Sequence, residues 1–185
     1  MPATPLVQAV YHEHLYHYGE PANCISFTDE PPPPEYPPHI NVLIWDADDA
    51  CPMTTLSTIG MSALPLPGAA HRAELHFSVR LRLTEKEKHT AAMFLANLAM
   101  YPFQTGEPLD WWHNIANPGG VPFYKTATSV FLHPAFVKDG WSSMTVEGCE
   151  IHILNVVPIT PAERELRKIT AILDALDGVD IFTPR

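Results

Sequence analysis

The chain has 185 residues, of which 46% are hydrophobic and 17% are charged, a balance typical of a globular protein of one domain. Its 21 acidic and 11 basic residues give a net charge of −10, which disfavours binding to nucleic acid and to anionic lipid headgroups. No apolar run is long enough to cross a membrane, and the first residues lack the pattern of a signal peptide. We therefore expect a cytoplasmic protein.

The cysteine and proline content limits the range of possible folds. Cys24, Cys51 and Cys149 are far apart and form no CxxC pair, so we expect buried free thiols rather than disulfides or a thiolate zinc site. The 20 prolines are spread along the chain and favour many short elements over a helical bundle.

The N-terminal segment is predicted to be one helix followed by a connector. Apolar spacing over residues 6–18 predicts a helix that ends at Gly19. The proline-rich segment 29–38 is predicted to be an extended, polyproline-like spacer rather than a ligand for a proline-binding module, because it lacks the basic residues of such ligands.

Three strands and a helix are predicted next. The segments 39–45 and 53–59 are rich in strand-forming residues and are separated by an acidic loop. The segment 73–83 alternates between apolar and polar residues, which predicts a strand with one buried face and one solvent-exposed face. Thr84 and Glu87 form a capping box, and the helix that follows is predicted to run to about Tyr101 and to end at Pro102.

The C-terminal part is predicted to contain three strands and a last helix. The strands are 126–132, 143–147 and 150–157, the last two joined by a tight hairpin. The motif Thr160-Pro161-Ala162-Glu163 begins a helix that reaches Leu176. The order helix, three strands, helix, three strands, helix predicts an α+β fold in which helices cover a mixed or largely antiparallel sheet.

Histidines near the N-terminus offer a possible metal site. His14 and His17 would share a helix face, and His12 lies close in sequence, but the spacing is not HExxH. We therefore favour surface histidines over a metal site.

Two further motifs fail their structural requirements. Gly60-Met61-Ser62 lacks the second glycine and the following helix of a hydrolase nucleophile elbow. Asp46, Asp48 and Asp49 lack the glycine and terminal glutamate of an EF-hand loop.

The irregular segment 103–124 is rich in aromatic residues, which makes it a candidate binding surface. The alternative is that its tryptophans fill the core beneath a long loop. The candidate partner-binding residues, one of which precedes the segment, are Tyr101, Trp111, Trp112, His113, Asn114 and Tyr124.

Several segments, in order from about residue 40 to the C-terminus, resemble the suppressor-of-fused family, whose signature includes a strand ending in T-x-G-M-S-x-x-P-M and then R-A-E-L. The matching segments are Met53–Pro65, Arg72–Leu75, Leu98–Phe103, His113–Ile115, Asn117–Gly120 and Val156–Thr160 with Glu163, Glu165 and Leu166. Leu66 replaces a methionine of this signature, and Trp112 stands where the family has glycine or aspartate.

The resemblance implies a non-catalytic protein-binding module. For the animal members of the family, the resemblance implies a binding mode in which a tyrosine and an acidic residue contact a transcription-factor peptide. That peptide is added as a β-strand between two domains. Tyr101 matches that tyrosine, whereas Trp112 supplies no carboxylate. The length of the chain suits one module, as in the compact bacterial members, some of which are proposed to be immunity proteins.

We therefore expect residues 1–185 to form a single domain that binds a protein partner stoichiometrically, as an immunity or regulatory protein, with no cofactor and no metal. A rival hypothesis is a metal- or histidine-dependent hydrolase that uses His12, His14, His17 or His113. A third is a structural subunit of a larger assembly.

Overall fold

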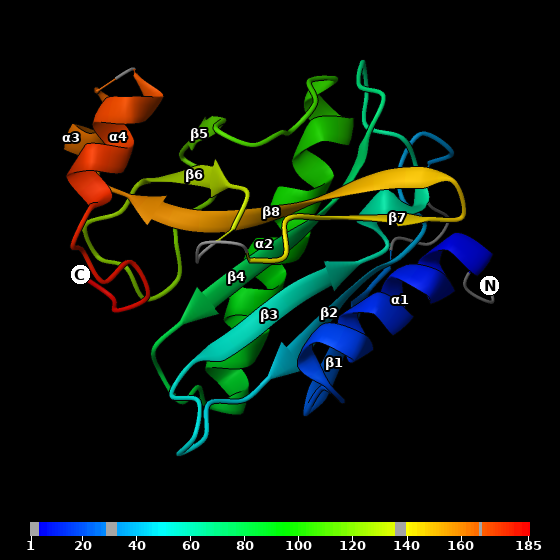
Figure 1. The fold of residues 1–185 in the computed structure, drawn as a ribbon, viewed down its shortest axis with the longest axis horizontal. Coiled ribbons are helices and arrows are strands. Elements are labelled where there is room, and N and C mark those ends of the chain that lie inside the picture. Colours follow the sequence, from blue (N-terminus) through cyan, green and yellow to red (C-terminus); the bar gives the residue numbers. More distant parts are fainter. Residues whose placement is uncertain (1–3, 29–32, 136–139, 167) are drawn as a thin grey trace.

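The computed structural model describes residues 4–28, 33–135, 140–166 and 168–185, and it confirms the predicted α+β fold (Figure 1). The helices are α1 (Pro5–Tyr18), α2 (Glu85–Thr105), α3 (Pro161–Arg164) and α4 (Ile169–Leu176), with a short 3-10 turn η1 (Met61–Ala63). The strands are β1 (Asn23–Phe27), β2 (Ile40–Trp45), β3 (Thr54–Ile59), β4 (Arg72–Val79), β5 (Asn114–Ala116), β6 (Ser129–His133), β7 (Ser143–Val146) and β8 (Cys149–Ile159).

All eight strands form one mixed sheet in the order β1-β2-β3-β4-β8-β6-β5, with β7 also paired to β8. Only the pairing of β4 with β8 is parallel among the described strands. The long strand β8 pairs with β7 over residues 149–152 and with β6 over residues 155–159. One strand therefore joins the two halves of the sheet.

Helices cover both faces of the sheet. Helix α2 lies behind the sheet in Figure 1, and α1 lies in front of it. Leu75, Phe77 and Val79 of β4 pack in the core that α2 covers. The other side of β4 was predicted to face solvent, and this is wrong: Glu74 and His76 are buried, because α1 covers that side.

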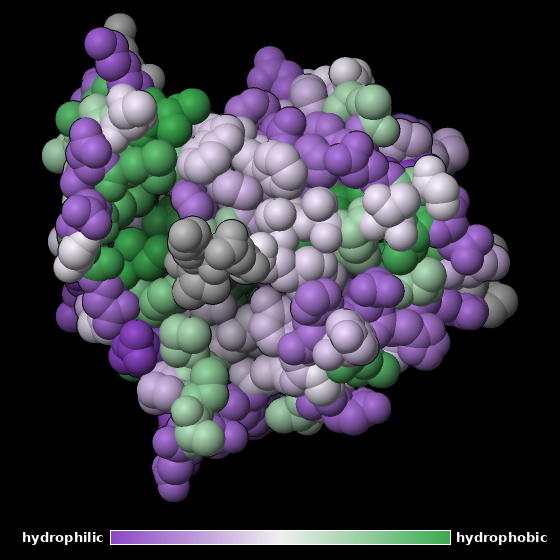
Figure 2. All heavy atoms as spheres, viewed as in Figure 1, coloured by the Kyte–Doolittle hydropathy of each residue, from purple (hydrophilic) through white to green (hydrophobic). Residues whose placement is uncertain are grey.

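Two predicted helix boundaries are also wrong. Helix α2 continues past Pro102 to Thr105 and ends at Gly106, which a proline in the last turn permits because only one hydrogen bond of the helix is lost. The predicted helix after Thr160 is divided into α3 and α4, and this break lets Ile172 pack against β6 and β8. Ile169 of α4 is exposed. Figure 2 shows hydrophobic atoms, in green, gathered where α3 and α4 lie in Figure 1.

The cysteines were predicted to be buried, and this is wrong: Cys24 and Cys51 are exposed and Cys149 is partly exposed. All three thiols are free, as predicted. In the proline-rich segment, residues 29–32 lie outside the described part of the chain. The following residues make a turn, in which the Tyr36 N–H donates to the Pro33 carbonyl at 3.0 Å. Among the described residues, no helix is long and apolar enough to cross a membrane.

Candidate functional site

The segment that holds most of the predicted binding residues is fixed to the sheet by β5, a strand that the sequence analysis missed. Strand β5 pairs with β6 at one edge of the sheet. Two further backbone hydrogen bonds extend the pairing at either end: Leu132 N–H donates to His113 O at 2.9 Å, and Asn117 N–H donates to Thr128 O at 3.0 Å. The segment is therefore an edge of the sheet rather than a free loop.

Trp112 adopts a backbone conformation that favours glycine. Its φ is +72°, and its N–H donates to the Leu132 carbonyl at 2.6 Å while the Leu132 N–H donates to His113. Trp112 and His113 thus oppose the single residue Leu132, which is the pattern of a G1 bulge with Trp112 at the position that glycine usually takes. This explains physically why a glycine or aspartate at this position is compatible with the same turn.

The two tryptophans lie on different sides of the sheet edge, and both are half-buried. The indole of Trp111 stacks on His152, with ring centroids 4.0 Å apart, and its Nε1–H donates to the Ile153 carbonyl at 3.0 Å. Trp112 packs near Phe131 and beside the α4 cluster. Each ring therefore supports the fold and also keeps part of its surface exposed.

Four of the six predicted residues line one hollow of about 330 Å³. Its lining residues are Tyr101, Glu107, Pro108, Leu109, Trp112, His113, Asn114 and Ile115. His113 and Asn114 are exposed, and Tyr101 is half-buried. Two of the lining residues, Asn114 and Ile115, belong to the edge strand β5, so aromatic and polar groups lie next to an edge strand.

Tyr124 does not line this hollow, because it is buried in the main core. Its hydroxyl donates to the Ile181 carbonyl at 2.8 Å, and burial raises the pKa of Tyr124 above its usual value. Tyr124 thus holds the C-terminal segment on the core.

The histidines of the hydrolase hypothesis are not brought together. His14 is buried under α1, where its Nδ1 donates to the Val10 carbonyl at 2.7 Å and its Nε2 lies 3.0 Å from Nε2 of His76. His17 stacks on Trp141 with centroids 4.0 Å apart, and His12 is exposed.

The serine of the Gly60-Met61-Ser62 motif has a structural role. Its hydroxyl donates to Oε1 of the buried Glu74 at 2.6 Å. Glu74 also accepts from the Gly60 N–H at 2.9 Å and from the Thr58 hydroxyl at 2.6 Å. Gly60 has a φ of +116°, and a Cβ there would lie 2.4 Å from the His39 carbonyl oxygen, so only glycine fits.

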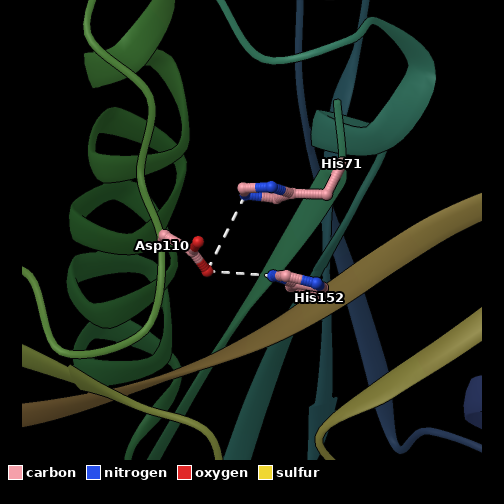
Figure 3. Close-up of side chains that lie close together, drawn as sticks. All are labelled: His71, Asp110 and His152. Atoms are coloured by element: carbon pink, nitrogen blue, oxygen red, sulfur yellow. Dashed lines mark hydrogen bonds and ion pairs between the residues drawn. The ribbon is translucent and has the colours of Figure 1, made fainter. Parts of the chain in front are cut away.

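The sequence analysis missed a cluster of His71, Asp110 and His152 (Figure 3). Within the described parts of the chain, it is the one group of three or more His, Cys, Asp or Glu side chains close enough to share a metal ion. Burial alone would raise the pKa of Asp110, but hydrogen bonds from His152 and the Trp111 N–H lower it below its usual value. No local spacing signals this cluster, because its members lie far apart in the sequence.

Comparisons with known proteins agree with this fold. The family model described as suppressor of fused protein (SUFU) matches residues 36–180. A crystal structure of a Sufu-Fu complex is similar with a TM-score of 0.66 and 16% identity, covering 96% of this chain and 85% of that chain. No curated protein sequence matches the chain.

Two further solved structures share the fold. A putative SUFU homologue from Neisseria gonorrhoeae gives a TM-score of 0.65 at 14% identity, covering 96% of this chain and 91% of that one. Drosophila Suppressor of Fused gives a TM-score of 0.63 at 15% identity, covering 96% of this chain but 48% of that one, so this chain spans about half of the Drosophila protein. Because the family model covers most of its length, the chain belongs to the suppressor-of-fused family.

Proposed function

We propose that this protein binds a protein partner stoichiometrically, without turnover, through the hollow and the open edge at β5. The observation that carries the proposal is that Tyr101, Trp112, His113 and Asn114 line one hollow beside an edge strand. Family membership and the Sufu-Fu complex of a relative support it.

The backbone of β5 is suited to pairing with a strand of the partner. His113 and Asn117 direct main-chain groups toward β6, and these groups alternate along an antiparallel strand. The N–H and C=O groups of Asn114 and Ala116 therefore point away from β6. An extended segment can add to such an edge by main-chain hydrogen bonds, while side-chain pockets supply specificity.

The hollow supplies the groups that would give this specificity. The Trp112 indole offers a large rigid surface, and such aromatic groups dominate many interfaces. The Tyr101 hydroxyl, the His113 imidazole and the Asn114 amide add donors and acceptors around it. A partner segment with an apolar side chain and nearby polar groups would fit this lining.

The net charge of −10 favours a basic partner, because charge complementarity accelerates association. We propose one of two roles for a negatively charged protein with a basic partner. It acts either as an immunity protein that neutralises a basic toxin in the cytoplasm or as a regulator of a basic protein.

The test is capture of partners from a lysate of the source organism, with identification by mass spectrometry and measurement of the affinity for the recovered partner. We expect one partner near a one-to-one ratio. Ala116→Pro removes an outward N–H from β5 and adds a ring at the edge, so it should abolish binding. Trp112→Gly removes the indole while retaining the turn, and it should weaken binding strongly.

Ala116→Thr is the matched control, because it keeps the N–H and favours a strand, and it should bind like the wild type. Circular dichroism checks that every variant is folded. A partner that binds the folded Ala116→Pro and Trp112→Gly variants as tightly as the wild type would contradict this surface.

A further inference from the structure

We propose that His71, Asp110 and His152 form a binding site for a divalent transition-metal ion of the zinc class. The three side chains come from the bend before β4, the segment before β5 and strand β8, and Asp110 lies beside the stacked rings of His71 and His152 (Figure 3). One ligand atom from each lies within 4.8 Å of the others. Two imidazole nitrogens and one carboxylate oxygen are a ligand set that suits zinc and related ions, with positions left open for water.

His152 lies between two carboxylates, which is the first argument for a cation here. Its Nε2 is 3.4 Å from Glu150 Oε1 and its Nδ1 is 2.9 Å from Asp110 Oδ1. When Nε2–H donates to Glu150, the Nδ1 lone pair faces Asp110, and this is the tautomer that a metal ion bound at Nδ1 requires. A carboxylate that orients a histidine through its far nitrogen is a recurrent partner of metal ligands.

His71 brings a second nitrogen to the same oxygen-rich point. Its Nε2 lies 3.8 Å from Asp110 Oδ1 and 3.1 Å from the Leu109 carbonyl oxygen. Without an ion, N–H groups of the two imidazoles can donate to these oxygens. A divalent cation would take the place of those protons and bind one nitrogen of each histidine and the Asp110 carboxylate.

The site is partly enclosed but can be reached by an ion. The exposed fractions of the side chains are 13% for His71, 37% for Asp110 and 10% for His152, so an ion would enter past Asp110. The rings of His71 and His152 are stacked with centroids 4.1 Å apart and planes within 12°. Because stacked rings cannot both direct a lone pair at one ion, metal binding requires the His71 ring to turn, and its position in a bend outside the sheet permits this.

A bound ion would join the segment before β5 to β8 and to the bend before β4. Asp110 directly precedes Trp111, whose indole stacks on His152. Metal binding would thus stiffen the backbone from which Trp112 and His113 project. The proposal does not depend on the partner, because metal binding is measured on the protein alone.

The experiment is calorimetric titration of tag-free, chelator-treated protein with Zn²⁺, with Mg²⁺ as the comparison ion and Co²⁺ for visible absorption spectra. We expect one Zn²⁺ per chain, no Mg²⁺ binding, and an affinity that falls as the pH is lowered through the range in which histidine is protonated. Glu150→Gln should weaken Zn²⁺ binding by about 10–100-fold. Asp110→Asn and His71→Ala should weaken it further than Glu150→Gln does.

The matched control is the double variant His12→Ala, His17→Ala, which removes two exposed histidines of α1 and should leave Zn²⁺ binding unchanged. Zn²⁺ should also raise the melting temperature of the wild type and of this control, but not that of His71→Ala. Binding that never saturates at one ion, or that persists unchanged in folded His71→Ala and Asp110→Asn, would overturn the proposal.

Discussion

At the scale of single residues, Trp112 shows how a backbone requirement and a side-chain role can conflict. The G1 bulge requires a positive φ, which Trp112 adopts at +72°, although a non-glycine residue in this region is less stable by about 1–2 kcal/mol. The indole offsets part of this cost by packing near Phe131 and the α4 cluster. The ring of Trp112 therefore stabilises the fold, while its backbone conformation destabilises it.

This conflict predicts the order of stability of two variants. Trp112→Ala and Trp112→Gly lose the same indole contacts, but only glycine relieves the strained φ. We expect the glycine variant to be more stable than the alanine variant by about 1 kcal/mol in urea unfolding. An alanine variant of equal or greater stability would show that the bulge relaxes when the indole is removed.

Glu74 illustrates a residue whose role the sequence could not reveal. It stands in the R-A-E-L segment of β4, where alternation places it on the side predicted to face solvent. In the fold it is buried and accepts hydrogen bonds from Thr58, Gly60 and Ser62. Burial raises the pKa of Glu74. Glu74 thus links β4 by hydrogen bonds to Thr58 of β3 and to Gly60 and Ser62 in the turn that follows β3.

At the scale of elements, α1 is held on the sheet by a pair of buried neutral histidines. The Nδ1–H of His14 donates to the Val10 carbonyl, so the one lone pair of its Nε2 accepts from either the His76 Nε2–H at 3.0 Å or the Ser57 hydroxyl at 2.8 Å. Burial lowers the pKa of His14 to about 4, with a smaller effect from His17, and lowers that of His76 well below its usual value. Both rings must therefore remain uncharged for α1 to dock.

This pair predicts loss of stability in acid. The folded-state pKa of His14, about 4, lies below the unfolded value of 6.5, so the unfolded state binds more protons as the pH falls. The contribution is fully present above pH 6.5 and is lost progressively as the pH falls from there to about 4. We expect the free energy of unfolding to fall by about 3 kcal/mol for His14 alone across this range.

Urea unfolding at a series of pH values measures this effect. His14→Gln, which cannot be protonated, should flatten the pH dependence, while His12→Gln at an exposed position should keep the wild-type profile. A wild-type profile in His14→Gln would show that other groups control acid stability.

Local signals predicted the elements that depend on local structure. The capping boxes at Thr84 and Thr160 are both present and begin helices, and the hairpin at Glu147-Gly148 joins β7 to β8 with positive φ at both residues. Strands β1 and β5 were missed, because short edge strands exist only through pairing with a neighbour. Strand β1 alternates in burial over only five residues and β5 has only three, so neither carries a pattern long enough to predict a strand.

The structure brings together predicted residues that two different signals had singled out. Trp112, His113 and Asn114 were grouped because they are neighbours in the sequence, and Tyr101 was also singled out by the family resemblance; all four line the same hollow. The cluster of His71 and His152 could not be found, since the parallel pairing of β4 with β8 brings these segments together. Tyr124 was included because aromatic composition alone cannot separate a core ring from a surface ring.

At the scale of the whole molecule, the structure predicts cooperative unfolding because one strand contributes to every apolar cluster. In β8, Ile151 and Ile153 pack with α1, Val157 and Ile159 pack with α4, and Leu154 lies in the core that α2 covers. Loss of β8 would therefore disrupt packing on both faces of the sheet, so no helix has a core independent of the others.

We expect tryptophan fluorescence and far-ultraviolet circular dichroism to report one urea transition with a common midpoint. Leu154→Ala removes a fully buried side chain and should lower the free energy of unfolding by about 2–5 kcal/mol, moving both transitions together. Leu166→Ala, at a residue that is 39% exposed, should change it by less than about 0.5 kcal/mol. Because Trp141 lies beside α1 and Trp112 beside the α4 cluster, separate midpoints for the two signals would show that one of these regions unfolds independently.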